Sequence, residues 1–455
     1  MKSSPSTFQL VVIAIFILLG ITGVIVFAGL GGVNAKKVPT ATIWGTVPAP
    51  EFNEMIRLIN AEKPQVSVTY VQKNPERFQE EFVNALAEET GPDIVLLSDD
   101  LLYSQKGKLM VIPYTTYDQR SYSDTYLNAA DHFMTPEGLL GVPFTADPIV
   151  MYYNRRLLST AGIAEPPKLW SELETMVPKL VNINETKGIT RSAIALGEAR
   201  NVTNAKEILV TMFMQAGNPV TVYDEKLQTI RNVIDNPSTD QSSQSSGGSE
   251  TTGSSQSGIS QSSPGESVLR FYTTFSNPAD PLYTWSRSMP TSKQAFLAGD
   301  LAIYIGYASE YARLRLENPN LDFDVATVPQ NSASYNVTYG KITAFSIVKR
   351  PKDAQAAFDV ILKLTEAPSQ KLWVDISRMP PVRKDLLSVP MTDKFLSVFY
   401  KATIQSKTWF DPDPAYSSVI FQDMIESVTT GLSSASDAIT TAKQRLDLLL
   451  QGTKS

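Results

Sequence analysis

Two short segments place side chains suited to binding polar solutes directly after predicted strands. They are residues 44–46, which begin with Trp44, and residues 98–100, which end with Asp100. A carboxylate accepts charge-assisted hydrogen bonds from sugar hydroxyls, and a flat indole covers the apolar face of a sugar ring. The two segments therefore predict recognition of a hydroxylated ring. Each residue also has a structural alternative, because Trp44 could close a core and Asp100 could cap the next helix.

The elements that must position these segments form an α/β pattern. Strands and helices are predicted to alternate over residues 40–44, 52–59, 66–70, 78–86 and 94–97, and the last of these is continuously apolar. This βαβαβ order is the beginning of a doubly wound sheet. Ligands of such sheets bind beyond the carboxyl ends of the strands, where both polar segments lie.

A second lobe is predicted to begin near residue 148. Its expected strands and helices are 148–153, 170–180, 301–305 and 323–328. A late strand at 342–348 and two helices within 417–450, which Gly431 separates, are expected to follow. Residues 236–266 are dominated by Ser, Gly, Gln and Thr, and we expect a disordered insertion within the second lobe.

The composition excludes several classes of protein. The net charge of −6 disfavours nucleic-acid binding, and the absence of cysteine excludes disulfides and thiolate metal sites. His132 is the only histidine, so metal centres built on several imidazoles are excluded, and we expect an ordinary surface residue. Prolines separate the carboxylates of residues 411–414, which favours a stiffened loop over a metal site. We expect no cofactor and no metal.

The N-terminus carries a long apolar segment. Residues 10–30 are almost wholly apolar, and about 20 such residues span a bilayer as a helix. We therefore expect residues 1–35 to be a single-pass membrane anchor with the remainder of the chain outside the cytoplasm. The alternative is a cleaved signal peptide, because residues 33–35 have the small-x-small pattern of a cleavage site.

Six short motifs occur in an order that is found in one protein family. They are residues 43–45, 92–95, 142–144 before 153–154, 166–168 with 170–173, 296–299 with 302–306, and 438–446. From about residue 38 to 450 the chain resembles family 1 of the extracellular solute-binding proteins of ABC importers, the group typified by maltose-binding protein. Each motif is weak by itself, and the order and spacing carry the resemblance.

The resemblance implies a type II periplasmic-binding-protein fold, in which two lobes joined by crossing segments close on a ligand. It places lobe 1 at 38–147 plus about 328–372, and lobe 2 at 148–327 plus about 378–450. Hinges are expected near residues 145–149, 326–330 and 373–378.

The resemblance also implies a set of ligand-contacting residues. Asp100 and Asp147 fall at acidic ligand positions of the sugar-binding member, and residues 306–309 fall where that member has a cleft tryptophan. No tryptophan stands there in this sequence, so stacking is expected from other rings, and the ligand's identity stays open. The expected ligand-binding residues are Trp44, Asp100, Asp147, Trp285, Gly306, Tyr307, Ser309 and Trp409.

The function implied is that of a monomeric, extracytoplasmic binding protein that delivers a sugar or similar polar solute to the membrane subunits of an ABC importer. It would catalyse no reaction. One alternative is an anchored glycoside hydrolase with Asp99, Asp100 and Asp147 as candidate acid and base. Another is a cell-surface adhesion or scaffold protein that uses the Ser/Gly-rich tract as a spacer.

Overall fold

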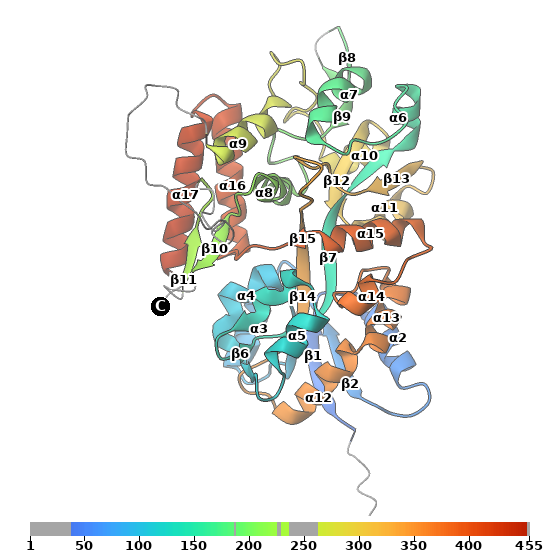
Figure 1. Ribbon diagram of the computed structural model, residues 1–455, viewed down its shortest axis with the longest axis vertical. Helices are drawn as coiled ribbons and strands as arrows, with labels where there is room; N and C mark the ends of the chain where they lie inside the picture. The colour runs from blue at the N-terminus through green and yellow to red at the C-terminus, as the bar shows by residue number, and fades with distance from the viewer. Residues whose placement is uncertain (1–37, 186–187, 225–228, 236–262, 453–455) are drawn as a thin grey trace, which may run out of the picture.

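A computed structural model describes residues 38–185, 188–224, 229–235 and 263–452, which form two lobes joined by long strands (Figure 1). The expected anchor, residues 1–35, lies outside the described residues, as does most of the Ser/Gly-rich tract. Within the described part of the chain, no helix combines the length and the apolar character needed to cross a bilayer.

Lobe 1 begins with the predicted βαβαβ unit. Strand β1 (Thr40–Gly45) pairs in parallel with β2 (Ser67–Gln72) and β3 (Ile94–Ser98). Helices α2 (Ala49–Ile59) and α3 (Phe78–Ala87) connect them, and their buried residues recur at helical spacing. The remaining short elements of this part are α4 (Asp99–Gln105), η1 (Lys106–Lys108), β4 (Ile112–Pro113), α5 (Gln119–Thr125), η2 (Asn128–Phe133), β5 (Met134–Thr135) and β6 (Gly138–Leu139).

Two long strands run from one lobe into the other. They are β7 (Val142–Asn154) and β14 (Thr338–Ile347), which pair antiparallel with Asp147 opposite Lys341. The strands form one sheet in the order β2-β1-β3-β14-β7-β12-β9-β8, with β13 beside β7 and β15 beside β14. Strand β7 begins earlier than the expected residue 148, because Pro148 interrupts the sequence pattern without ending the extended chain.

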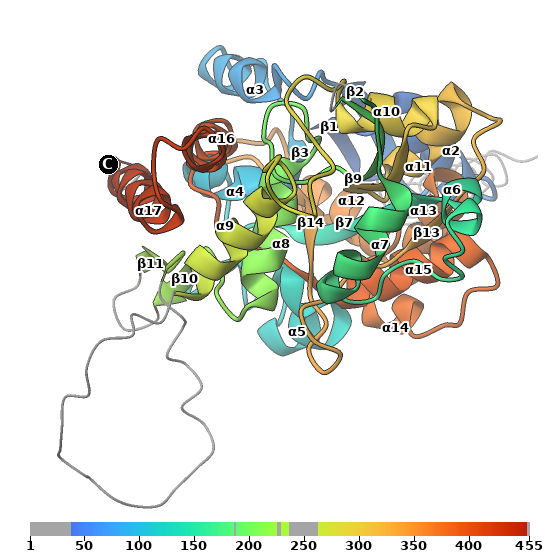
Figure 2. The ribbon, with the colours of Figure 1, turned by 90° about the horizontal axis from the view of Figure 1, so that it is seen from above.

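Lobe 2 surrounds the other half of this sheet. Its strands are β8 (Asn182–Ile183), β9 (Ile189–Ile194), β12 (Leu301–Tyr307), β13 (Phe323–Ala326) and β15 (Ser406–Lys407), with a separate hairpin of β10 (Thr221–Asp224) and β11 (Thr229–Asn232). Its helices are α6 (Arg155–Thr160), η3 (Trp170–Glu172), α7 (Leu173–Leu180), α8 (Ala205–Gln215), α9 (Pro264–Thr274), α10 (Ser292–Ala298), α11 (Glu310–Glu317), α15 (Lys394–Ile404), α16 (Pro414–Thr429) and α17 (Ala435–Gly452). Helices α16 and α17 pack side by side at one edge of the lobe (Figure 2).

The second crossing between the lobes lies later in the chain than expected. Val337 and Tyr339 are buried in the core of lobe 2, whereas Ile342 is buried in the core of lobe 1. The side chain of Gln215 on α8 holds the preceding loop, donating hydrogen bonds to the carbonyls of Pro329 (3.0 Å) and Val337 (2.9 Å). The expected boundary near residue 328 is therefore wrong, and the crossing lies at residues 339–342.

The last crossing also lies later than the expected boundary at residue 378. Helix α12 (Ala354–Thr365) and Trp373 of α13 (Ala367–Ser377) pack in the core of lobe 1, and Val382 is buried there too, whereas Leu387 of α14 (Lys384–Leu387) is buried in the core of lobe 2. The chain between α13 and α14 runs beside β7, because the amide of Ala146 donates to the carbonyl of Pro380 at 3.1 Å. Lobe 2 therefore resumes at the end of α14 and continues with α15.

The Ser/Gly-rich tract was expected to extend to residue 266, and its described end is helical. Helix α9 begins at Pro264, and the Ser263 hydroxyl caps it by accepting a hydrogen bond from the amide of Glu266 at 3.2 Å. A serine followed by proline and then glutamate is an N-terminal helix signal. The boundary at residue 266 was predicted from the Ser and Gly content of the tract, which does not take this helix signal into account.

Candidate ligand-binding site

An ion pair joins the end of one strand to the middle of another where the lobes meet. Asp100 lies in the first turn of α4, directly after β3, and Lys341 lies on β14 within the second crossing. The Lys341 Nζ is 3.1 Å from Asp100 Oδ2, and the Ser98 hydroxyl donates to the same carboxylate. The side chains are 30% and 12% exposed for Lys341 and Asp100, so the pair is shielded but not sealed.

The charges at this pair stabilise each other. Burial raises the pKa of Asp100, but the charge of Lys341, the Ser98 hydrogen bond and the charge of Lys206 outweigh it and hold the pKa below its ordinary value. Burial lowers the pKa of Lys341, and the charges of Asp100 and Glu207 outweigh it and raise the pKa. Both groups are therefore ionised at neutral pH.

Two buried oxygen atoms beside this pair lack partners. Asp99 Oδ1 accepts a hydrogen bond from the amide of Ile342 at 2.7 Å, whereas Asp99 Oδ2 and the Tyr307 hydroxyl have no hydrogen-bond partner among the described residues. Burial and the adjacent charge of Asp100 raise the pKa of Asp99 well above its ordinary value, which favours a protonated carboxyl. Buried polar atoms are normally paired, so these two oxygens fit a ligand that brings hydroxyls.

Lobe 2 contributes a second ion pair. Lys206 in the first turn of α8 lies 3.0 Å from Asp411 Oδ2, and the Ser417 hydroxyl donates to the same oxygen at 2.8 Å. The charge of Lys206 helps to lower the pKa of Asp100, so a residue of lobe 2 interacts electrostatically with a residue of lobe 1. Asp413 caps α16 by accepting from the amide of Ala415 at 3.0 Å, so both carboxylates of residues 411–414 have protein partners.

Asp147 ties the crossing strand β7 to helix α11. Its carboxylate accepts hydrogen bonds from the Ser309 amide at 3.0 Å and the Ser309 hydroxyl at 2.7 Å. Burial raises the pKa of Asp147 to about 6, although the Ser309 hydrogen bonds and Lys341 oppose the shift. The structure thus brings Asp147 and Ser309 together beside Lys341, the cross-strand neighbour of Asp147.

Replacing Asp147 with asparagine is expected to stabilise the protein at pH 8 and to have little effect below pH 4. The raised pKa means that the folded protein binds this proton more tightly than the unfolded chain, so stability falls as the pH rises from about 4 to about 6. Asparagine removes that cost, about 1 to 3 kcal/mol, and can still accept from the Ser309 amide. Urea unfolding of both proteins at pH 4, 6 and 8 checks this. A D147N variant less stable than wild type at pH 8 would contradict the assignment.

Two of the three expected tryptophans are buried in a hydrophobic core. Trp285 and Trp409 are 0% and 2% exposed in the core of lobe 2, and the Trp285 indole nitrogen donates to Asn201 Oδ1 at 3.1 Å. Trp44 is half-buried at the end of β1, where Lys73 Nζ lies 3.6 Å from its ring centroid. Tyr307 is beside the Asp100–Lys341 ion pair, with its ring centroid 5.1 Å from Lys341 Nζ.

Gly306 has a packing role in β12. A Cβ at this position would lie 2.7 Å from both Glu310 Oε1 and the ring of Tyr304. The same Glu310 carboxylate accepts from the Tyr307 amide at 3.0 Å. Gly306 therefore lets Glu310 fix the backbone beside Tyr307, and its contribution to the site is indirect.

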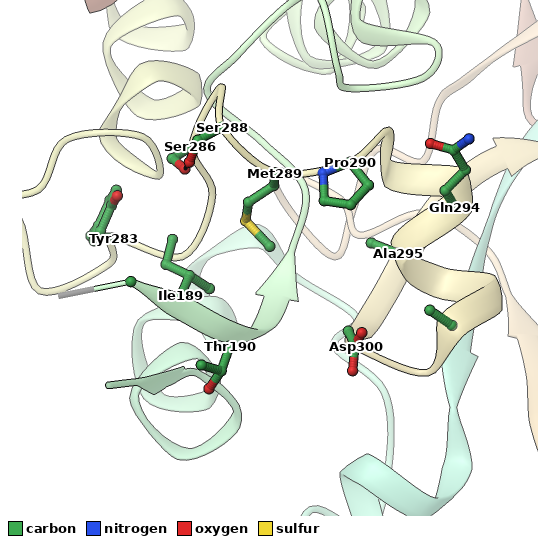
Figure 3. A pocket seen from close by; sticks show the side chains of 12 residues that line it. Ile189, Thr190, Tyr283, Ser286, Ser288, Met289, Pro290, Gln294, Ala295 and Asp300 are labelled. Atoms are coloured by element: carbon green, nitrogen blue, oxygen red, sulfur yellow. Dashed lines mark hydrogen bonds between the residues drawn. The ribbon is translucent and has the colours of Figure 1, made fainter. Parts of the chain in front are cut away.

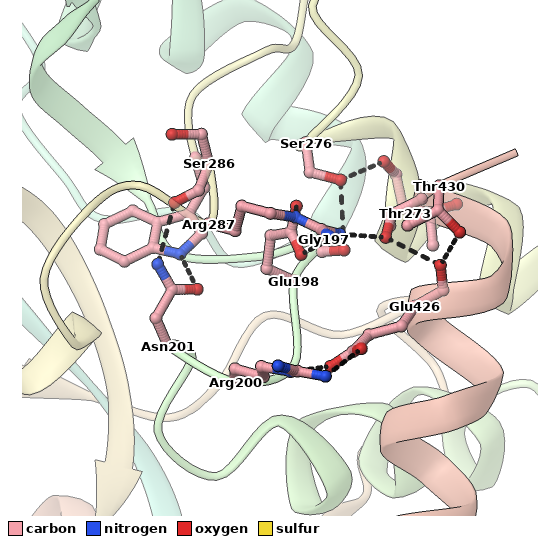
Figure 4. Close-up of polar contacts among 12 residues, drawn as sticks. Gly197, Glu198, Arg200, Asn201, Thr273, Ser276, Ser286, Arg287, Glu426 and Thr430 are labelled. Atoms are coloured by element: carbon pink, nitrogen blue, oxygen red, sulfur yellow. Dashed lines mark hydrogen bonds and ion pairs between the residues drawn. The ribbon is translucent and has the colours of Figure 1, made fainter.

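Trp285 belongs to a polar network that fastens a loop of lobe 2 to α16 (Figure 4). In this network Arg287 pairs with Glu198 at 3.1 Å, and Arg200 pairs with Glu426 on α16 at 2.7 Å. The ring of Trp285 is fully buried in the core of lobe 2, so its role in the structure is packing. Nearby, the start of β9 and residues on either side of Trp285, among them Tyr283, Ser286 and Met289, line a cavity of about 460 Å³ (Figure 3). None of the expected site residues lines it.

Lys341, Lys206, Asp99 and Asp411 were not among the expected ligand-binding residues. A signal existed for Lys206, because Lys206 and Glu207 are the only charged residues of α8, in which almost every other residue is buried. Charges retained at the start of such a helix indicate a function there. No comparable signal marks Lys341, since its register opposite Asp147 depends on how the lobes connect.

Comparisons with known proteins identify relatives of this arrangement. The family model described as bacterial extracellular solute-binding protein matches residues 54–397. A binding protein of Brucella abortus (strain 2308) is 22% identical over 165 residues, which cover 35% of this chain and only 39% of that protein.

Two solved structures share the fold at low sequence identity. A cyclic α-maltosyl-1,6-maltose binding protein from Arthrobacter globiformis is 17% identical with a TM-score of 0.71, covering 91% of this chain and 99% of that one. UgpB from Mycobacterium tuberculosis, solved in complex with glycerophosphocholine, is 17% identical with a TM-score of 0.67, covering 90% and 98%. The two-lobed α/β fold is therefore that of the periplasmic-binding-like proteins.

Proposed function

This chain belongs to the bacterial extracellular solute-binding proteins, and we propose from that premise that it captures a neutral carbohydrate between its lobes for an ABC importer. Two buried oxygens beside the Asp100–Lys341 ion pair carry the proposal, because Asp99 Oδ2 and the Tyr307 hydroxyl have no hydrogen-bond partner among the described residues. A sugar hydroxyl both donates and accepts hydrogen bonds, so it can satisfy a phenol, a protonated carboxyl and a carboxylate at once.

The charge balance favours a neutral ligand over an anionic one. Each lysine at the site already has a carboxylate partner, Lys341 with Asp100 and Lys206 with Asp411. Glu207 adds negative potential, since its charge raises the pKa of Lys341. An acidic sugar or a phosphate ester would meet no uncompensated cation here and would have to displace one of the paired carboxylates.

Tyr307 supplies the flat ring that carbohydrate recognition needs. Its phenol is uncharged at neutral pH, because burial and then the charge of Glu207 raise its pKa well above the ordinary value. The ring lies at the end of β12, in line with the carboxyl-end rule for ligands of α/β sheets. Trp44 is the second candidate ring, since β1 and β3 are neighbours in the sheet.

The remaining parts of the proposal concern the cell. Residues 1–35 would tether the lobes outside the cytoplasmic membrane, which raises their local concentration near importer subunits. Carbonate-resistant recovery of the full chain with membranes tests the tether. Closure would follow if the ligand contacts both lobes, and a smaller radius of gyration on ligand addition tests it.

A thermal-shift screen tests the binding proposal. At a ligand concentration of about 100 Kd, binding to the folded state alone adds about 2.7 kcal/mol, which raises the melting temperature by several degrees. We expect one or more neutral mono- or oligosaccharides to produce such a shift, and the matching acidic sugars and glycerophosphodiesters to produce none. A shift confined to the anionic compounds would contradict the proposal.

A further inference from the structure

The only histidine of the chain forms a contact outside the candidate site. His132 in η2 stacks on Phe410, with ring centroids 3.9 Å apart and planes 10° from parallel. Its Nδ1 is 2.8 Å from the Thr408 hydroxyl, which also lies 3.4 Å from the carbonyl of Ala129. The sequence favoured an ordinary surface histidine, and the structure instead shows a half-buried ring with two specific partners.

The two sides of this contact belong to different lobes. Two other residues of η2, Ala130 and Phe133, are buried in the core of lobe 1. Phe410 is fastened to lobe 2, because its amide donates to the Thr221 hydroxyl of β10 at 3.0 Å and its carbonyl accepts from that hydroxyl at 3.1 Å. The stacked rings therefore bridge the lobes.

The lobe 2 side of the contact continues directly into the candidate site. Asp411 follows Phe410 in the chain and pairs with Lys206 at 3.0 Å. A displacement of residues 408–411 would consequently move one carboxylate of the site. The contact and the site are coupled through a segment of four residues.

Solvent has a route to the imidazole. A cavity of about 460 Å³ lies between the lobes and is lined by His132, Ala129 and Leu127 from lobe 1 and by Thr408 and Val337 from lobe 2. A proton can therefore reach the ring without unfolding of either lobe. The cavity also leaves room for the ring to rotate away from Phe410.

Four charged groups lie on the elements around this ring. The groups on the surrounding elements are Asp131 on η2, Lys407 on β15, Asp411 after Phe410, and Asp224 on β10. Lys407 donates to the Tyr335 hydroxyl at 2.7 Å, Asp411 pairs with Lys206, and Asp224 pairs with Arg231 at 2.9 Å. No carboxylate contacts His132 among the described residues.

We propose that His132 is an acid-sensitive latch between the lobes, and that its protonation releases residues 408–411 from lobe 1. The stacked, desolvated ring is tolerated while it is neutral. Once it is charged, the ring gains hydration by leaving Phe410, and the contact is lost.

The sign and size of the effect follow from linkage. Burial lowers the pKa of His132 to about 4 in the contact, whereas a free histidine titrates near 6.5. The latch is therefore fully formed above about pH 6.5 and is lost as the pH falls toward 4. The equilibrium constant of the contact should fall about thirtyfold by pH 5.

Because the chain has a single histidine, proton NMR of the full-length protein in detergent micelles reports the His132 titration without assignment. The expected wild-type pKa is well below 6, and Phe410→Ala should raise it toward 6.5. A wild-type pKa near 6.5 would overturn the proposal, whether or not the Phe410→Ala variant folds. This measurement needs no ligand, so its outcome is separate from that of the carbohydrate proposal.

Small-angle scattering between pH 7 and pH 4.5 tests the release itself, with far-UV circular dichroism to confirm that both lobes stay folded. The wild-type radius of gyration should increase as the pH falls. His132→Phe keeps a stacked ring that cannot be protonated, so its radius should stay constant. Equal pH dependence of the two proteins, or none in either, would overturn the proposal.

Discussion

Replacing Lys341 with methionine is expected to destabilise the protein by about 2 to 3 kcal/mol and to weaken carbohydrate binding at least tenfold. Methionine keeps the length of the side chain but leaves the Asp100 carboxylate, which is 12% exposed, without its cationic partner. Removing one member of a buried pair costs more than the pair contributes, because the remaining charge stays desolvated. Urea unfolding and calorimetric titration with a sugar found by the screen measure the two effects.

The matched control removes both charges. In the Asp100→Asn, Lys341→Met double variant no ion is left unpaired, and asparagine can keep the hydrogen bond from the Ser98 hydroxyl. We expect most of the lost stability to return while binding stays weak. If the Lys341→Met single variant bound the sugar with unchanged affinity, the assignment of Lys341 to the binding site would be contradicted.

Replacing Trp285 with alanine is expected to cost about 3 to 5 kcal/mol of stability and to leave the sugar affinity unchanged in the folded protein. The indole is 0% exposed, and its nitrogen donates to Asn201 at 3.1 Å. Its removal therefore opens a cavity and leaves the Asn201 carbonyl oxygen without that donor. Urea unfolding gives the stability, and titration well below the transition gives the affinity.

The contrast with Trp44 makes this prediction specific. Trp44 is half-buried, so its replacement with alanine removes less packing and should cost clearly less stability than the Trp285 substitution. If Trp285→Ala instead abolished binding at nearly wild-type stability, Trp285 would be the stacking ring that the sequence predicted, and its placement in the core would be wrong.

The sequence was informative wherever local periodicity decides the structure. Strand β3 follows from the apolar run of residues 94–97, and α2 from the helical spacing of Phe52, Met55 and Ile59. The resemblance to the extracellular solute-binding proteins, which also implied the two-lobed fold, is confirmed by the family match over residues 54–397.

The crossings could not be placed with the same accuracy. Val337 and Ile342 are both buried apolar residues five positions apart, and nothing local shows that they face different cores. Tertiary contacts decide which core each residue enters, such as the hydrogen bonds that the Gln215 side chain donates to the carbonyls of Pro329 and Val337.

The candidate site was predicted in part. Asp100, Asp147, Tyr307 and Ser309 come together near Lys341, because strand ends and the β7–β14 register bring them there. Trp285 and Trp409 were expected at the site and are instead buried in the core of lobe 2. The sequence alone does not show whether a tryptophan is buried by residues distant in the chain. Ion pairs such as Lys206 with Asp411 join residues more than 200 positions apart, which no local pattern reveals.

A crystal structure with a neutral sugar from the thermal-shift screen tests the central claim most directly. We predict electron density for the sugar between the lobes, with its hydroxyls in hydrogen-bond reach of Asp100 and the Tyr307 phenol. Density confined to another place, such as the cavity beside residues 283–300, would contradict the assignment of this site.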